Sequence, residues 1–105
     1  MSIRYVLAPE AAVDLVQIWG YIKQKVDVEM ADRVEAIIRE KILFLAKTPG
    51  AGHWRKDLTH EPVKFFSVYS YLIVYRPESS PLQVVAILHG YRDVEQLLRK
   101  RPRTP

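Results

Sequence analysis

Residues 65–98 read FFSVYSYLIVYRPESSPLQVVAILHGYRDVEQLL, and this stretch decides the fold of the 105-residue chain. Two apolar runs rich in β-branched and aromatic residues lie on either side of a turn that Pro77 and Pro81 bound. This pattern predicts two strands joined by a hairpin turn. Because both runs are apolar at successive positions, we expect central strands that are covered on both faces. The chain then presents residues 89–93, His-Gly-Tyr-Arg-Asp, and a tail with apolar residues at helical spacing.

Upstream, residues 9–48 have the pattern of two amphipathic helices. Pro9 suits the first position of a helix, and Asp27 is placed to cap a second one. The apolar residues that recur at intervals of three and four are Ala12, Leu15, Trp19, Ile22 and Val26 in the first helix and Met30, Val34, Ile37, Ile38, Ile42 and Leu45 in the second. Because almost no residues separate these helices, we expect them to form an antiparallel hairpin, which ends at residues 48–50.

The rest of the chain completes an α+β pattern. Strands are expected at residues 3–7, 63–68, 71–76 and 83–89, and a short helix at residues 92–98. Residues 51–62 have neither a helical nor a strand period, so we expect a polar loop there. The predicted order is an N-terminal strand, the helical hairpin, a mostly antiparallel sheet and the short C-terminal helix. We expect one domain over residues 1–105, with a basic tail at residues 99–105.

The composition narrows the class of protein. Sixteen Lys and Arg against twelve Asp and Glu give a net charge of +4, which favours anionic partners. The chain has no cysteine, its three histidines are far apart in sequence and its four glycines form no phosphate-binding loop, so we expect no metal and no cofactor. The N-terminus has no signal-peptide pattern, and no apolar run reaches the ~18 residues of a membrane span. We therefore expect a cytoplasmic protein with no membrane association.

Residues 89–93 are the strongest candidate for chemistry. The imidazole of His89, the phenol of Tyr91 and the guanidinium of Arg92 could serve as general acid, general base and phosphate clamp in RNA cleavage. In the structural alternative, His89 ends a strand, Gly90 makes a turn with positive φ and Asp93 favours the start of a helix. The residues alone leave both interpretations open.

Other aromatic and basic residues are candidates for binding a partner. Trp54 lies among basic residues at positions 53–57, where it could anchor a protein interface, stack on a base or fold over a sheet edge. Tyr69, Tyr71 and Tyr75 alternate along a strand, which fits either a core or a partner groove. The basic end is either solvated or meets an acidic partner or phosphates. Its residues are Arg99, Lys100, Arg101 and Arg103.

Several short motifs, taken in order, resemble one known family. They are Ala8-Pro9-Glu10-Ala11, the helical hairpin ending at Pro49, and residues 52–58, 62–66, 71–76 and 88–93. Over residues 3–98 this ordered set is similar to the RelE/ParE superfamily of bacterial type II toxins. The closing His-Gly-Tyr-Arg-Asp and the strand Tyr-Leu-Ile-Val-Tyr-Arg resemble the ParE branch more than the RelE branch.

The two branches imply different functions. Resemblance to ParE implies a growth inhibitor, associated with plasmid or chromosome maintenance, that blocks DNA gyrase by binding it and is not itself an enzyme. Resemblance to RelE implies a ribosome-dependent endoribonuclease that cuts mRNA. In both branches a cognate antitoxin neutralises the toxin by wrapping around it, and contact with operator DNA is made only through the antitoxin. The resemblance leaves the oligomeric state of the toxin–antitoxin complex open.

Departures from the RelE pattern favour the ParE interpretation. Aligning the strand at residues 71–76 places Leu72 where RelE-type nucleases carry an arginine, and aligning the last turn places Leu98 where they carry a tyrosine. An aliphatic side chain neither transfers a proton nor stabilises a charged phosphate intermediate. A nuclease would have to use other residues. These are Arg76, His89, Tyr91 and Arg92.

The resemblance therefore implies two binding surfaces and no catalytic site. Candidates for contact with gyrase are Arg92, Arg99, Lys100 and Arg101. Candidates for contact with the antitoxin, expected over the helical hairpin and the exposed sheet, are Trp54, Tyr69, Tyr71 and Tyr75. A third alternative is a relative that keeps the fold as a partner-binding module without toxicity.

Overall fold

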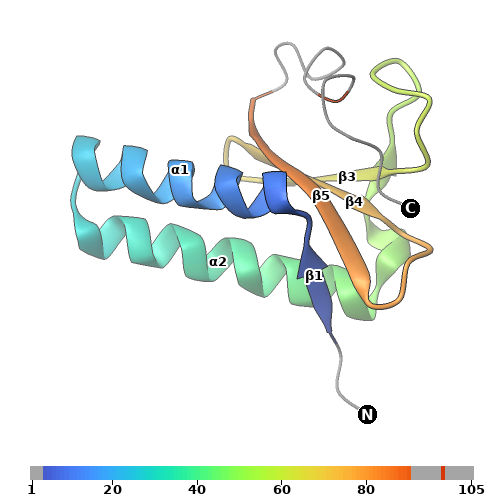
Figure 1. The fold of residues 1–105 in the computed structure, drawn as a ribbon, viewed down its shortest axis with the longest axis horizontal. Helices are drawn as coiled ribbons and strands as arrows, with labels where there is room; N and C mark the ends of the chain where they lie inside the picture. Colours follow the sequence, from blue (N-terminus) through green and yellow to red (C-terminus); the bar gives the residue numbers. More distant parts are fainter. Residues whose placement is uncertain (1–3, 91–97, 99–105) are drawn as a thin grey trace.

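The computed structural model describes residues 4–90 and residue 98, and it has an α+β fold (Figure 1). Its elements are β1 (Tyr5–Leu7), α1 (Pro9–Lys25), α2 (Val28–Lys47), a 3-10 turn η1 (Pro49–Ala51), β2 (His53–Trp54), β3 (Lys64–Val68), β4 (Tyr71–Arg76) and β5 (Leu82–His89). The predicted helical hairpin and the strands around it are confirmed. The expected C-terminal helix falls outside the described residues, apart from Leu98.

The five strands form one mixed sheet in the order β1-β5-β4-β3-β2. β1 runs parallel to β5, whereas the other neighbouring strands pair antiparallel. The expectation of an irregular loop at residues 51–62 is wrong at β2, where His53 lies opposite Phe65 and Trp54 opposite Lys64. Two residues are too few to show the alternating pattern of a strand. The extended conformation of β2 comes from its pairing with β3.

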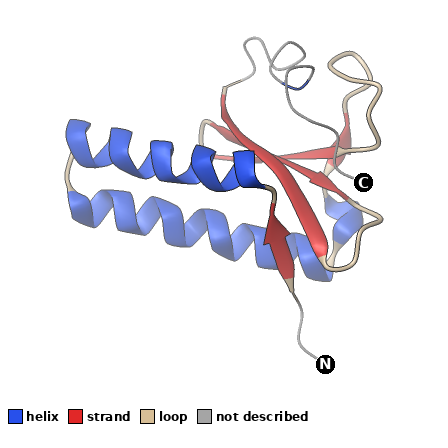
Figure 2. Ribbon diagram, viewed as in Figure 1, coloured by secondary structure: helices blue, strands red, loops and turns tan. Residues whose placement is uncertain are grey.

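The helical hairpin covers one face of this sheet and extends beyond it (Figure 2). The Oδ1 atom of Asp27 accepts a hydrogen bond from the Met30 amide at 2.8 Å, which confirms the predicted cap of α2. The predicted apolar stripe of α1 is partly wrong, because Val26 lies just after the end of the helix and is 61% exposed. The residues buried along the two helices are Ala11, Leu15, Ile18 and Ile22 in α1 and Ala31, Ile38, Ile42 and Leu45 in α2.

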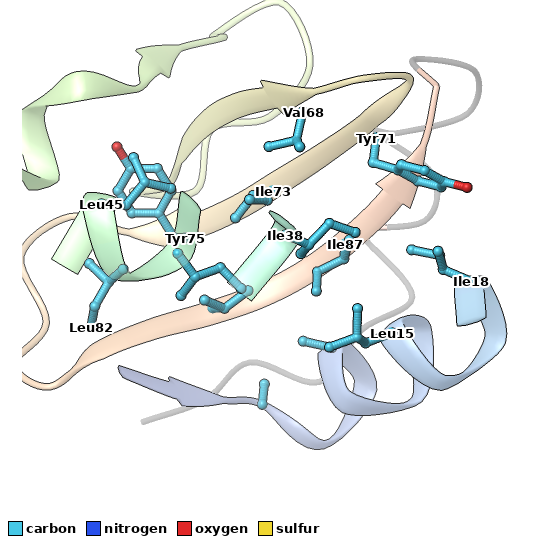
Figure 3. Packing of buried hydrophobic residues seen from close by; sticks show 14 of the residues in the cluster. Leu15, Ile18, Ile38, Leu45, Val68, Tyr71, Ile73, Tyr75, Leu82 and Ile87 are labelled. Atoms are coloured by element: carbon cyan, nitrogen blue, oxygen red, sulfur yellow. The ribbon is translucent and has the colours of Figure 1, made fainter. Parts of the chain in front are cut away.

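Two apolar clusters lie on opposite faces of the sheet. The larger cluster joins both helices to the sheet and includes Leu15, Ile38 and Ile73 (Figure 3). The smaller one has six buried members, with Leu58, Val85 and Leu98 packed against them. Those six are Val63, Phe65, Leu72, Val74, Ala86 and Leu88. The prediction that the strands at residues 71–76 and 83–89 are central and covered on both faces is therefore confirmed.

Tyr75 connects the end of the helical hairpin to the centre of the sheet. Its side chain is fully buried, and its hydroxyl donates to the Pro49 carbonyl at 2.7 Å and accepts from the Gly52 amide at 2.9 Å. Gly52 approaches so closely that a Cβ atom there would collide with the Tyr75 hydroxyl and the Phe65 carbonyl. The chain between α2 and β2 is thus held by one phenol and one glycine.

Tyr75→Phe should lower the free energy of unfolding by about 1–3 kcal/mol, because the buried Gly52 amide loses its acceptor. Urea denaturation measures this change. Tyr69→Phe is the matched control, since Tyr69 is 68% exposed and its substitution should change stability by less than about 0.5 kcal/mol. Equal stability of the two variants would show that the Tyr75 hydroxyl does not hold the connection.

Candidate functional site

A groove lies between α1 and the end of β5. The ring of His89 lies 5.0 Å from that of Tyr71, at an interplanar angle of 34°. The groove has a volume of about 510 Å³. Its wall on α1 is formed by Asp14, Gln17, Ile18 and Tyr21. The site thus combines apolar and aromatic surface with a few polar groups, which is typical of binding sites.

Asp14 fixes α1 against β5 beside this groove. Its Oδ2 atom accepts a hydrogen bond from the Ile87 amide at 2.9 Å. β1 pairs with β5 only as far as Val84, so the carboxylate of Asp14 caps an amide at a strand edge that β1 does not reach. The groove therefore has one wall whose position is set by a hydrogen bond between helix and sheet.

Burial raises the pKa of the Tyr71 hydroxyl above its ordinary value, with a smaller contribution from Tyr21. The side chain of Tyr71 is almost fully buried, whereas His89 and Tyr21 are exposed. Tyr71 therefore enters the groove as a neutral, mainly apolar side chain.

Arg76 and His89, both proposed for a nuclease, lie at opposite ends of the sheet. Tyr71 pairs with His89, whereas Arg76 pairs with Gln83. Tyr71 and Arg76 are five residues apart on β4, which corresponds to about 17 Å along an extended strand. The Nε atom of Arg76 is buried and has no hydrogen-bond partner among residues 4–90 and 98. The structure does not bring these two candidates into one site.

The sheet face away from the helices carries apolar residues at the positions that bear on nuclease activity. Leu72 is 1% exposed and belongs to the smaller apolar cluster. Leu98 packs against the same cluster. The two positions at which RelE-type nucleases carry an arginine and a tyrosine therefore both belong to one apolar region, which offers no charge to a phosphate.

The four candidates for antitoxin contact differ in exposure. Trp54 is 48% exposed, with the Nζ atom of Lys64 5.1 Å from its ring centroid. Tyr69 is more exposed still, in the turn between β3 and β4, where its backbone has a φ of 55°. Tyr71 shows only a small part of its side chain, in the groove. Tyr75 is fully buried with its hydroxyl bonded inside the protein, so it has no surface for a partner.

The remaining candidates lie outside the described residues. They are Tyr91, Arg92, Arg99, Lys100 and Arg101. Among residues 4–90 and 98, no group of three His, Asp or Glu side chains is arranged to hold a metal ion. No helix in that part of the chain is long and apolar enough to cross a membrane.

Comparison with known proteins identifies the family. Residues 5–94 match the model of the ParE toxin of the type II toxin–antitoxin system, parDE. The chain belongs to the ParE toxin family. The prediction of a ParE-like member of the RelE/ParE superfamily is thereby confirmed, and the protein is a toxin of a type II toxin–antitoxin system.

The fold of this ParE toxin also occurs in a solved structure. A chain from the chromosomal ParDE TA system of P. aeruginosa superposes with a TM-score of 0.70 at 18% sequence identity. The match covers 85% of this chain and 97% of that chain. At this identity the likeness establishes the fold. No curated protein sequence matches the chain significantly.

Some residues of the groove escaped prediction from sequence. Asp14, Gln17 and Tyr21 lie on α1 at intervals of three and four, on the flank of the buried stripe. Polar and aromatic residues at such a flank indicate a groove wall only when the position of the neighbouring strand is known. The sequence does not reveal that β5 continues past β1 and opens this space.

Tyr71→Phe in this ParE toxin should make stability less sensitive to alkaline pH. Because the folded-state pKa of Tyr71 is raised, its contribution is fully present below the ordinary value of about 10 and is lost as pH rises through the raised value. Urea denaturation between pH 7 and pH 11 should therefore show a shallower loss of unfolding free energy above pH 10 in the variant. Both proteins should have parallel profiles between pH 7 and pH 9, and identical slopes above pH 10 would contradict the assignment.

Proposed function

We propose that this ParE toxin acts by binding DNA gyrase and blocking its supercoiling activity, and that a cognate antitoxin neutralises it. The observation that carries the proposal is the match to the ParE toxin model over residues 5–94, which spans the helical hairpin and the whole sheet. Gyrase inhibition is the activity that the ParE branch implies. It requires a folded surface rather than a catalytic centre.

The geometry of the sheet supports binding over RNA cleavage. Arg76 and His89 are far apart, and Leu72 lies in the apolar cluster against which Leu98 packs on the sheet face away from the helices. An RNA-cleaving site needs acid, base and phosphate-binding groups around one phosphate. The two described candidates for a nuclease, Arg76 and His89, do not meet this requirement. An endoribonuclease would depend on Tyr91 and Arg92 together with His89.

Basic residues near the C-terminus are the proposed contacts with gyrase. They are Arg92, Arg99, Lys100 and Arg101. The net charge of +4 favours an acidic surface on the enzyme or phosphates of the DNA that it holds. Because gyrase acts on chromosomal DNA, this function places the toxin in the cytoplasm.

Exposed aromatic residues are the proposed contacts with the antitoxin. Trp54 and Tyr69 offer large side chains at the β2–β3–β4 side of the sheet, and Tyr71 contributes part of a ring at the groove. Aromatic anchors of this kind dominate binding energy in protein interfaces. Contact with operator DNA is expected only through the antitoxin.

A supercoiling assay tests the proposed function directly. Purified toxin should inhibit supercoiling of relaxed plasmid by gyrase, and equimolar antitoxin should restore it. Purified ribosomes with a defined mRNA provide the second arm. Discrete cleavage ends on the mRNA, together with unimpaired supercoiling, would replace gyrase inhibition with the endoribonuclease function.

Arg92→Ala, and separately a chain ending after Leu98, should each weaken gyrase inhibition by about tenfold or more, because truncating a charge contact at an interface costs about 2 kcal/mol or more. The toxin concentration that halves supercoiling measures the effect. A circular dichroism melt confirms that each variant is folded. Full inhibition by both folded variants would show that gyrase binds elsewhere.

Trp54→Ala should weaken antitoxin binding by about tenfold or more, because an exposed tryptophan at an interface is a typical hot spot. Isothermal titration calorimetry with the purified antitoxin measures the dissociation constant. The melting temperature should stay close to that of the wild type. An unchanged dissociation constant would remove Trp54 from the antitoxin surface.

A further inference from the structure

A strip of basic and aromatic residues runs from the flank of α2 across the edge of the sheet. We call it the Lys–aromatic strip, and it consists of Lys41 and Phe44 on α2, Lys64 and Phe66 on β3, and Trp54 on β2. Phe44 and Phe66 bring the helix and the strand together, with ring centroids 5.9 Å apart. Lys64 lies opposite Trp54 in the strand pairing, with its Nζ atom 5.1 Å from the ring centroid.

The large apolar side chains of the strip are exposed to solvent. Phe44 is 43% exposed and Trp54 48%, and Phe66 is half-buried. Large apolar side chains that gather on one surface mark an interaction site, whereas single ones do not.

The charge of the strip is positive and is not compensated within the described part of the chain. Lys41 and Lys64 take part in none of the ion pairs among residues 4–90 and 98, and neither does the neighbouring Lys47. Lys64 makes only a 3.3 Å hydrogen bond to the Gly50 carbonyl. The one carboxylate on this part of α2 is Glu40, so lysine is in excess. A partner with carboxylates would be complementary.

The ring geometry favours a peptide over a nucleic acid. Stacking of a base needs an open aromatic face. Lys64 lies over the ring of Trp54, and the rings of Phe44 and Phe66 are tilted by 47° relative to each other, so they form no parallel slot. Apolar side chains of a peptide have no such requirement, because hydrophobic contact is not directional.

We propose that the Lys–aromatic strip binds an acidic segment of the antitoxin whose carboxylates meet Lys41 and Lys64 while its apolar side chains cover Phe44, Phe66 and Trp54. This inference rests on the proposed neutralisation by an antitoxin. It adds the chemistry of the bound segment and two lysines as determinants of the pairing. Antitoxin binding should therefore weaken as salt concentration rises.

Charge reversal tests the proposal. The variant Lys41→Glu/Lys64→Glu should bind the antitoxin at least about 30-fold more weakly than the wild type, because like charges then face each other. The matched control is Lys23→Glu/Lys25→Glu, which makes the same change in net charge at the end of α1, where each lysine also lies near an aromatic ring. Its dissociation constant should change by less than about threefold, as expected for charges outside the Lys–aromatic strip.

A neutral pair of substitutions tests the effect of the charges without reversing them. Lys41→Gln/Lys64→Gln keeps the length of the side chains close to that of lysine, and it should bind with intermediate affinity and a smaller dependence on salt. Calorimetry between 50 and 500 mM NaCl measures the dissociation constant and its dependence on salt. Over this range the electrostatic screening length falls from about 14 Å to about 4 Å. Melting temperatures identify any variant that is not folded.

The possible outcomes separate this inference from the proposed function. If wild-type toxin binds the antitoxin and the Lys41/Lys64 variants bind equally well, the strip is not the site, although neutralisation stands. Equal weakening in the Lys23/Lys25 control would show a general charge effect and overturn the assignment. Loss of gyrase inhibition with normal antitoxin affinity would assign the strip to gyrase instead.

Two further results would also overturn the proposal. Fluorescent 12-nucleotide single-stranded RNA and DNA serve as probes for the nucleic-acid alternative. If either binds the wild type and fails to bind the Lys41/Lys64 variants, while antitoxin affinity is unchanged, the strip binds nucleic acid. If the wild type does not bind the antitoxin at all, the proposed neutralisation fails, and this inference fails with it.

Discussion

The hydroxyl of Tyr75 is the contact on which the arrangement of this toxin depends. It lies on the central strand β4 and holds both ends of the turn that follows α2, through the Pro49 carbonyl and the Gly52 amide. One hydroxyl thus satisfies the Gly52 amide and the Pro49 carbonyl, and its loss would leave a buried polar group unpaired at a cost in free energy. This bond places β2 beside β3. It thereby places Trp54 next to Lys64, at the sheet edge where the surfaces proposed for partner binding lie.

Because both faces of the sheet are covered, the surfaces that can bind a partner lie at its edges and ends. The helices cover one face and the smaller apolar cluster, with Leu98, fills the other. A face filled in this way cannot hold a water-exposed phosphate site. Two surfaces that stay accessible are the groove between α1 and β5 and the strip between α2 and β3. Both suit recognition of another protein, in keeping with a ParE toxin proposed to act by binding.

Many local features could be predicted from sequence because they depend on residues close together in the chain. The Asp27 cap, the end of α2 near Pro49 and the two-sided burial of β4 and β5 follow from local chemistry and apolar pattern. Errors arose where the deciding partner is distant in sequence, and where a helix ends earlier than its apolar pattern. Trp54 is extended because β3 pairs with it, and Val26 is exposed because α1 has already ended. Tyr75 is buried although its alternation with Tyr69 and Tyr71 also suited a partner groove.

The sequence by itself determined the α+β class, the helical hairpin, the central strands and the resemblance to ParE toxins, because hydrophobic period, caps and ordered motifs are properties of the chain. Only the tertiary structure decided which side chains share a surface. It separated Arg76 from His89, placed Leu98 against the cluster that contains Leu72, and brought Phe44 on α2 to Phe66 on β3. The physical reason is that strand register and helix packing are set by burial of the whole core, and no short stretch of sequence contains that information.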